Sequence, residues 1–287
     1  MKFSYYPGCT MYEQAKNFEK STLESARSLG LELEEMEDWQ CCGAVYPLVT
    51  DNLFPLVSAA RNLATAEKAG HDMVTLCSAC HQVHKRTQHL ARSDQESREK
   101  LETFMEEKLP GKIQVRHFIE VLRDQVGFDR LAEKAGDRLS GLRVAPYYGC
   151  LLLRPEDEMQ FDDPEAPRIM SHLISSVGAE PVEFPQQIEC CGAYLSLNRT
   201  DLARRRVERI VAGARDRGAQ VLMVSCPLCQ YNLDYLQPED PESLPVLYFT
   251  QILALGLGLD EEVCDFDLHR LDPRRVLSGA GISGEVV

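Results

Sequence analysis

Residues 219–229 read Ala-Gln-Val-Leu-Met-Val-Ser-Cys-Pro-Leu-Cys, and residues 72–80 read Asp-Met-Val-Thr-Leu-Cys-Ser-Ala-Cys. Each stretch is a short apolar run that stops at a CxxC pair. Each also follows a segment of helical periodicity that finishes at a glycine, Gly70 in one case and Gly218 in the other. Short apolar runs bounded by such signals are typical of buried strands. The sequence therefore predicts, twice, a buried strand that delivers two cysteines to the loop beyond it.

The same order of elements surrounds both stretches. Strands are predicted over 2–6 and 142–148, helices over 14–29 and 166–177, strands over 31–36 and 181–184, and helices over 53–69 and 199–217. Strands that alternate with helices indicate an α/β fold, with parallel sheets covered by helices. The cysteines then lie in loops at the carboxyl ends of strands, the edge at which open α/β sheets bind their ligands.

Ten of the eleven cysteines form two matched sets of five. The sets are Cys9, Cys41, Cys42, Cys77 and Cys80, and Cys150, Cys190, Cys191, Cys226 and Cys229. In both sets 34 residues separate the CC pair from the CxxC pair, and the flanking residues 115–122 resemble 246–253. An internal duplication explains these matches. We expect two pseudo-symmetric repeats of βα units, residues 1–140 and 141–262, followed by a C-terminal tail, 263–287.

The repeats differ in two places. From the first cysteine to the CC pair there are 31 residues in the first repeat and 39 in the second. The surplus near 154–167 is rich in proline and acidic residues, so it is expected to be a surface loop. The second difference, 89–108, is highly charged and favours a helix. It is either a solvated helix or a docking surface for a partner subunit.

Length and composition indicate a soluble globular protein. The chain has 287 residues, of which 44% are hydrophobic and 26% charged. No apolar run approaches the roughly 18 residues of a membrane span, and no signal peptide is visible, so we expect a cytoplasmic protein without a transmembrane segment. Disulfides are rare in the cytoplasm, so the cysteines suggest metal or redox chemistry. A formal net charge of −14 argues against nucleic-acid binding.

Five thiolates at one site are more than an ordinary metal centre takes. Structural zinc and a cubane cluster of four irons each bind four cysteines. A fifth cysteine suggests an unusual cluster, because adjacent cysteines can reach different irons. Gly43 and Gly192, which follow the CC pairs, let the backbone pass close to inorganic sulfide and donate an amide hydrogen bond to it. The alternative is two zinc sites with one spare cysteine each.

Other residues near the cysteines allow a structural and a functional interpretation. Trp39, just before the first CC pair, is expected to shield a cluster from water. His81 and His84 follow the first CxxC on a predicted helix and are expected to be surface or capping residues. If one of them faces the cluster, its near-neutral pKa suits proton delivery to a thiolate leaving group.

The remaining candidates are expected to be structural. Lys85, Arg86 and Arg154 are interpreted as solvated charges, with attraction of an anionic substrate as the alternative. Cys264 lies outside both sets and is expected to be a small buried apolar residue.

With YYPGC at 5–9, two CCG triplets and two CxxC pairs, the chain resembles the B subunit of heterodisulfide reductase, in the cysteine-rich CCG family. The resemblance covers residues 1 to about 258. It implies two non-cubane [4Fe-4S] clusters, one held by each set of five cysteines, with zinc at one site as the alternative. It also implies that the clusters face each other across a cavity. A small-molecule or protein disulfide would be reduced there to two thiols, or the reverse, by one electron from each side.

The resemblance also implies partners. The sequence has no ferredoxin-like cysteine run, flavin motif or GxGxxG fingerprint. Electrons are therefore expected from an iron–sulfur C-type subunit, fed by a flavin-containing A-type subunit. The 34-residue spacer is slightly shorter than is usual in the family, which indicates a branch other than the methanogen one.

Two other functions are weighed against disulfide reduction. CCG proteins also resemble electron-relay or assembly subunits of fumarate reductase, succinate dehydrogenase and 2-hydroxy-acid oxidase complexes. Two complete, symmetric sets of five cysteines favour the disulfide reductase, because a relay does not require them. Thiol–disulfide exchange through a CxxC alone would leave the CC pairs unexplained.

Overall fold

The computed structural model describes residues 1–44, 53–109, 111–238 and 240–282. They form two four-stranded parallel sheets, which confirms the predicted α/β class. The first sheet has the order β2-β1-β3-β4 and the second has the order β6-β5-β7-β8. The strands are β1 (Lys2–Tyr6), β2 (Glu32–Glu35), β3 (Met73–Thr75), β4 (Val115–His117), β5 (Arg143–Tyr147), β6 (Glu180–Pro181), β7 (Val221–Val224) and β8 (Val246–Tyr248).

Helices cover both sheets. The first repeat contributes α1 (Lys16–Ser28), η1 (Phe54–Leu56), α2 (Val57–Ala69), α3 (Ser78–Ser93), α4 (Gln95–Met105), α5 (Phe118–Val121), η2 (Leu122–Val126) and α6 (Phe128–Ala135). The rest contributes α7 (Glu156–Met159), α8 (Ile169–Ser176), η3 (Pro185–Ile188), η4 (Ala193–Leu195), α9 (Thr200–Asp216), α10 (Pro227–Tyr235), α11 (Phe249–Gly256), η5 (Glu261–Cys264), η6 (Phe266–Leu268) and α12 (Arg274–Gly279). Every residue of β3 and β7 is buried, as expected of strands covered on both faces.

Most predicted strands and helices are present within a few residues of the expected bounds. The strand expected over 181–184 is the exception, because β6 comprises only Glu180 and Pro181. Val182 still donates its N–H to the carbonyl of Val144, but Pro185 then begins the 3-10 helix η3. The fourth strands, β4 and β8, were not predicted. Each runs into a helix that begins at once, and each junction is held by a side chain that accepts from the backbone N–H of the last strand residue.

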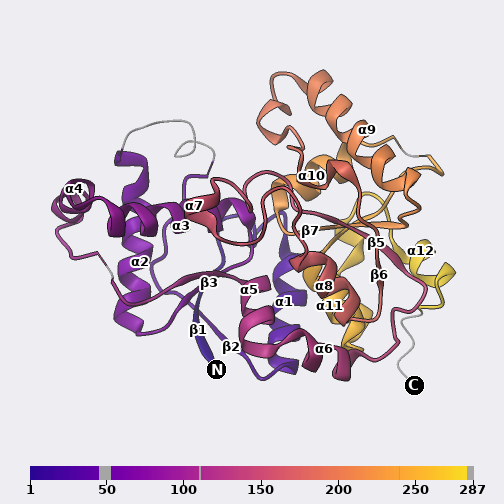
Figure 1. Cartoon of the computed structure of the whole chain (residues 1–287), viewed down its shortest axis with the longest axis horizontal. Coiled ribbons are helices and arrows are strands. Elements are labelled where there is room, and N and C mark those ends of the chain that lie inside the picture. The colour runs from indigo at the N-terminus through magenta and orange to yellow at the C-terminus, as the bar shows by residue number, and fades with distance from the viewer. Residues whose placement is uncertain (45–52, 110, 239, 283–287) are drawn as a thin grey trace.

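The two repeats pack against each other through their helices. α1 of the first repeat lies beside α11 of the second (Figure 1). Between them the rings of Phe18 and Tyr248 stack with centroids 4.1 Å apart. The hydroxyls of Ser21 and Thr250 are hydrogen-bonded at 2.7 Å. α5 and α8 make the pseudo-symmetric contact on the other side.

The insertion 154–167 lies largely at the surface and is mostly irregular, as predicted, but Met159, Phe161 and Pro167 are buried. It contains α7 and packs against α3 of the first repeat. Gln82 donates to the carbonyl of Arg154 at 2.6 Å, and Arg86 pairs with Glu158 at 2.6 Å. The Phe161 side chain is buried, with its ring 5.7 Å from that of His117. The charged and aromatic side chains of the insertion thus have partners on the first repeat, and these contacts hold the segment against α3.

The charged stretch 89–108 forms the end of α3 and the whole of α4, rather than one helix. The break falls at Asp94, whose carboxylate caps α4 by accepting from the N–H groups of Glu96 and Ser97. Leu101 and Met105 are buried beneath α4. The helix therefore has one buried face and an otherwise charged, solvated surface.

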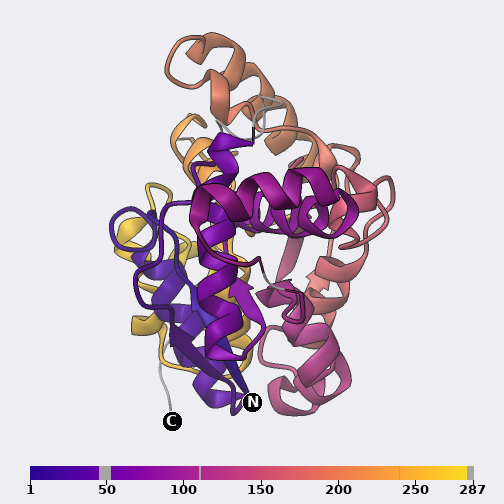
Figure 2. The ribbon, with the colours of Figure 1, turned by 90° about the vertical axis from the view of Figure 1, so that its left-hand side faces the viewer.

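The C-terminal tail folds back onto the body. Figure 2 shows the yellow tail against the indigo N-terminal segment. The His269 ring lies 3.0 Å from the Asn17 amide nitrogen and 2.8 Å from that of Gln251. The backbone N–H of Arg270 donates to Asp234 on α10. The part of the predicted tail beyond residue 282 lies outside the described residues, and the proposed division at 140 and 262 stays a prediction.

The buried His269 predicts a pH dependence of stability. Burial lowers the pKa of His269 to about 4, and its ring is surrounded by amide donors. In the unfolded chain the ring protonates near pH 6.5. Between these values unfolding takes up a proton, so stability falls as the pH drops from about 6.5 toward about 4. We expect a His269→Gln variant to lose less stability than the wild type between pH 7 and 5 in urea titrations. Identical losses in the two proteins would contradict this role.

No helix in the described part of the chain is long and apolar enough to cross a bilayer.

Candidate functional site

The CxxC pairs open helices at the carboxyl edges of the two sheets. Cys77 follows β3 and caps the N-terminus of α3, and Cys226 follows β7 and caps α10. Cys9 and Cys150 follow β1 and β5, the neighbouring strands. Because parallel strands end at a common edge, these loops converge as predicted.

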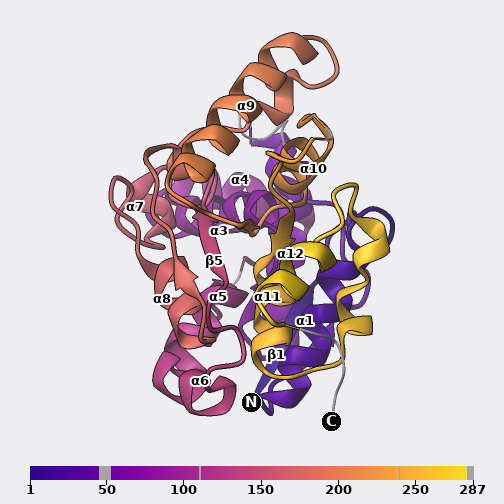
Figure 3. The ribbon, with the colours of Figure 1, turned by 90° about the vertical axis from the view of Figure 1, so that its right-hand side faces the viewer.

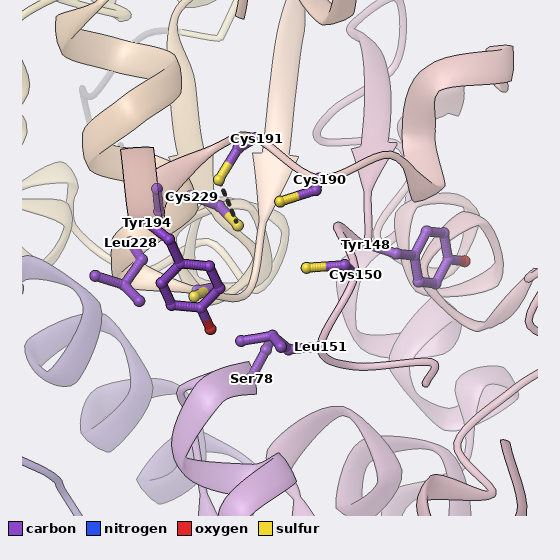
Figure 4. Close-up of a pocket in the computed structure, with 11 residues that line it drawn as sticks. Ser78, Tyr148, Cys150, Leu151, Cys190, Cys191, Tyr194, Leu228 and Cys229 are labelled. Carbon is purple, nitrogen blue, oxygen red and sulfur yellow. Dashed lines mark hydrogen bonds between the residues drawn. The ribbon is translucent and has the colours of Figure 1, made fainter. Parts of the chain in front are cut away.

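In the second repeat all five cysteines of the set line one small cavity (Figure 4). The other lining residues are Ser78, Tyr148, Leu151, Ala193, Tyr194 and Leu228. In Figure 4 the sulfurs of Cys150 and Cys190 point side by side into the cavity, and the Tyr194 ring lies beside Leu228 with its hydroxyl turned toward Ser78.

The two sets of cysteines have the same internal geometry. The Sγ atoms of Cys42 and Cys80 are 3.4 Å apart, and those of Cys191 and Cys229 are 3.6 Å apart. After each CC pair the glycine has positive φ, and its N–H donates to the sulfur two residues earlier. These distances are 3.5 Å in the first repeat, to Cys41, and 3.3 Å in the second, to Cys190.

The two sites adjoin each other. The N–H of Ser78 donates to the carbonyl of Ser225 at 3.1 Å, and the two serine hydroxyls are 2.8 Å apart. The thiol of Cys226, in the second repeat, is the main cause of the raised pKa of Cys77, in the first. Both helices that carry the CxxC pairs thus begin at the junction of the repeats.

Buried tyrosines hold both CC loops in the same way. The Tyr6 hydroxyl donates to the carbonyl of Gln40, and the Tyr147 hydroxyl donates to that of Glu189. These two carbonyls belong to the residues just before the CC pairs. The Tyr6 oxygen also accepts from the N–H of Cys42. The repeated aromatic pair in front of the first cysteine therefore has a structural role at the site.

The chemistry of the donor set fits a polynuclear metal centre. Hydrogen bonding from Cys41 and Cys80 lowers the pKa of Cys42, and hydrogen bonding to Cys42 raises the pKa of Cys80. A group of thiols this close can hold few negative charges by itself. Several thiolates in one place require several positive charges beside them, which a cluster of iron ions supplies.

The cysteines differ in exposure. The CxxC cysteines and the second cysteine of each CC pair are buried, Cys150 and Cys190 are partly exposed, and Cys9 and Cys41 are exposed. Among the described residues, no three His, Cys, Asp or Glu side chains converge on a position for a single metal ion.

The prediction that His81 and His84 lie at the surface is wrong, because both are fully buried. α3 lies beneath the insertion and against α2, so this face of the helix is not solvated. His84 contacts Asn62 and the carbonyl of Cys80, and burial lowers its pKa. The Nε2 atom of His81 has no hydrogen-bond partner and lies 3.6 Å from a carboxylate oxygen of Glu120.

Trp39 and Arg154 contact other side chains of the protein in ways that suit a structural role. The Trp39 ring packs against Tyr6 and stacks on Tyr12, so it covers the tyrosine that holds the first CC loop. Arg154 pairs with Glu165, at the surface. Cys264 is fully buried, as predicted.

Sequence reasoning missed the residues that cross between the repeats. Ser78 comes from the first CxxC but lines the cavity of the second repeat. Its sequence position places it next to its own cysteines and gives no sign of the crossing. Tyr194 is three residues beyond Cys191 and Leu228 is inside the second CxxC, so proximity in sequence to the cysteines could have identified both.

The glycine before the first cysteine of each set lets the backbone pass close to a sulfur of the CxxC pair, so replacing it should have a measurable effect. Gly149 has φ +65°, and a Cβ added there would lie 3.3 Å from the Cys229 sulfur. We expect Gly149→Ala to cost about 1–2 kcal/mol in backbone strain and to reduce bound iron by displacing that sulfur. Gly30→Ala is the matched control, because Gly30 has φ +73° with nothing within 4 Å of the added Cβ. Equal iron contents in the two variants, measured after anaerobic reconstitution, would refute the effect.

Comparison with known proteins supports the duplication. The profile of the cysteine-rich domain family, CCG, matches residues 3–83 and again residues 144–234. The chain is 32% identical to the 8-methylmenaquinol:fumarate reductase membrane anchor subunit of Wolinella succinogenes, over 96% of this chain and 99% of that protein. It is 28% identical to the B subunit of the ferredoxin/F420H2-dependent CoB-CoM heterodisulfide reductase of Methanosarcina acetivorans, over 91% of both chains.

A protein of Archaeoglobus profundus, described as like the B subunit of heterodisulfide reductase, is also 28% identical, over 91% of this chain and 92% of that protein. Among solved structures, a hypothetical protein from Helicobacter pylori matches with a TM-score of 0.69 at 12% identity, over 94% of this chain. The chain spans about half (51%) of the length of that protein, and the likeness concerns the fold alone.

Proposed function

The chain belongs to the cysteine-rich domain (CCG) family, and we propose that it is the catalytic iron–sulfur subunit of a heterodisulfide reductase-like complex. The observation that carries the proposal is the pair of like cysteine sets. Each is built by one repeat, and the two meet where Ser78 contacts Ser225. A disulfide has two equivalent sulfurs, and two related sites match that symmetry.

Each repeat would hold one non-cubane [4Fe-4S] cluster through its own five cysteines. The ligands would be Cys9, Cys41, Cys42, Cys77 and Cys80 in one site, and Cys150, Cys190, Cys191, Cys226 and Cys229 in the other. The amides of Gly43 and Gly192, which face sulfur in the structure, would stabilise sulfur atoms of the bound clusters. Zinc at one site remains the alternative occupant.

The reaction is the addition of two electrons and two protons to a disulfide, which breaks the S–S bond and gives two thiols. The bound clusters would supply one electron to each sulfur. The chain's own residues would define the shape of the site and exclude water from it, since Leu151 and Leu228 line the cavity with apolar surface. Burial raises the pKa of Tyr194, so its hydroxyl stays protonated and can donate a hydrogen bond to a substrate sulfur.

The electrons would come from a complex in the cytoplasm. Its further members would be an iron–sulfur C-type subunit and a flavin-containing A-type subunit. The substrate would be a small-molecule or protein disulfide.

A second candidate function follows from the relative in Wolinella succinogenes, whose name is that of a fumarate reductase subunit. In this case the chain relays electrons, or supports assembly, within a fumarate reductase or succinate dehydrogenase-like complex. Both sites would then carry electrons without binding a disulfide.

One set of measurements tests the proposal and separates the candidates. Anaerobic iron and sulfide analysis with electron paramagnetic resonance should give about eight irons per chain, from two four-iron clusters. The purified chain with a reduced dye should then turn over with disulfides. Stoichiometric zinc at either set would reject the paired clusters. If no disulfide supports turnover, while the complex reduces fumarate, the relay function is favoured.

A further inference from the structure

α10, the helix that carries Cys229, presents two exposed tyrosines. Tyr231 and Tyr235 are 48% and 46% exposed, and their rings stack with centroids 4.6 Å apart. They lie four residues apart and so share one helix face. Figure 3 shows α10 at the surface of the molecule, below α9. Exposed aromatic side chains gathered on one face are typical of protein interaction sites.

The corresponding face of the first repeat is covered. On α3, Gln82 and Arg86 lie two and six residues beyond Cys80. Tyr231 and Tyr235 have the same spacing from Cys229 on α10, so the two pairs occupy equivalent positions. Gln82 is hydrogen-bonded to the carbonyl of Arg154, and Arg86 is paired with Glu158. The insertion 154–167 of the second repeat therefore occupies the position on α3 that is open on α10.

The composition of the insertion that covers α3 indicates what kind of segment would bind the equivalent face of α10. Residues 154–167 contain six carboxylates and one arginine, and they bury Phe161 between the repeats. The first repeat has no equivalent insertion, because its segment from the first cysteine to the CC pair is eight residues shorter, 31 against 39. In the described part of the chain Tyr231 and Tyr235 stay exposed, so this position on α10 is open to another molecule.

The helix α9 carries a run of exposed arginines, although the whole chain has a net charge of −14. Arg204, Arg205 and Arg206 are all exposed on α9, which packs against α10. The loop that leads into α9 is fixed to α10 by a 2.7 Å hydrogen bond between Ser196 and Asn232. Cations beside an aromatic patch favour an anionic partner and speed its association.

We propose that the tyrosine face, defined as Tyr231 and Tyr235 on α10 together with Arg204–Arg206 on the adjoining helix α9, binds an acidic segment of the iron–sulfur subunit that delivers electrons. The inference rests on the proposed function, in which a partner supplies the electrons. Because Cys226 is the N-cap residue of α10 and Cys229 lies within the helix, a partner docked there sits next to the second set of cysteines. Electrons would therefore enter at the site of the second repeat.

The test uses the intact complex, isolated anaerobically through a tag on this chain. The probe is its iron–sulfur partner subunit, released with salt and rebound to the immobilised chain. We expect Tyr231→Ala with Tyr235→Ala to weaken rebinding at least about tenfold, since truncated aromatic anchors have effects of this size or larger. Turnover driven by the partner should fall in parallel. Iron content and dye-driven turnover should be unchanged, because neither tyrosine lines the cavity.

The matched control is Phe54→Ala with Phe104→Ala, a pair of exposed aromatic rings 6.3 Å apart in the first repeat, and it should rebind normally. Arg204→Glu with Arg205→Glu provides an independent variant at exposed positions. It should slow association and reduce its dependence on salt.

Normal rebinding of both the tyrosine and the arginine variants would overturn the inference. A tyrosine variant that changes only the self-association of the chain would also overturn it, in favour of a second copy as the occupant. Failure of the proposed function would look different. The wild-type chain would then reduce no disulfide with the dye, while partner rebinding would still report on the tyrosine face.

Discussion

A Cys191→Ser variant should hold about four irons per chain instead of about eight, and should lose disulfide turnover by at least about hundredfold. Cys191 is buried, and its sulfur lies 3.6 Å from that of Cys229 in the cavity of the second repeat. A serine hydroxyl is a harder and poorer ligand for iron than a thiolate, so the second site should lose its cluster. Iron analysis, electron paramagnetic resonance and a dye-driven disulfide assay measure these effects.

Cys264→Ser provides the control for this experiment. Cys264 is equally buried, but it lies outside both sets, with its sulfur near the carbonyl of Gln251. It should keep its full iron content and activity. Cys42→Ser should reproduce the loss in the first repeat. Full turnover in either the Cys42 or the Cys191 variant would reject the paired-site mechanism.

The second large effect concerns stability. Phe18→Ala should lower the free energy of unfolding by about 3–5 kcal/mol, because it removes a fully buried aromatic ring from between the repeats. That ring stacks on Tyr248 and meets Phe249 edge-on, so its loss leaves a cavity between α1 and the second sheet. Urea titration of the metal-free and metal-loaded protein measures the change.

Phe104→Ala is the surface control for this variant. Phe104 is 59% exposed, and its replacement should change stability by less than about 0.5 kcal/mol. If Phe18→Ala cost less than about 1 kcal/mol, the two repeats would be only weakly coupled through this contact.

The sequence predicted most of the fold because its strongest signals are local. Apolar runs such as β3 and β7, and glycines at helix ends such as Gly70, depend only on neighbouring residues. The cysteine sets could be placed at the sheet edges because each follows a predicted strand. The strands β4 and β8 have only three residues each, too few to show a period in the sequence.

The errors concern contacts between the repeats. The acidic, proline-rich composition of 154–167 indicated a loop, but Glu158 and Phe161 have partners on the first repeat. His81 is buried within its own repeat, where its ring lies beside Thr75, His117 and Glu120. Ser78 reaches the cavity of the other repeat across the junction. Such contacts join positions more than 70 residues apart, as in the pair Arg86 and Glu158, and no local pattern predicts them.

The contiguous strand order within each sheet has a consequence for biosynthesis. Neither sheet borrows a strand from the other, so all strands and all five thiols of the first repeat are synthesised before β5. Iron and sulfide could be inserted into that repeat while the rest of the chain is still being translated. Until the later half arrives, however, the nascent repeat exposes Phe18 and the side of α3 that carries Gln82 and Arg86, surfaces that a chaperone or scaffold protein would need to protect.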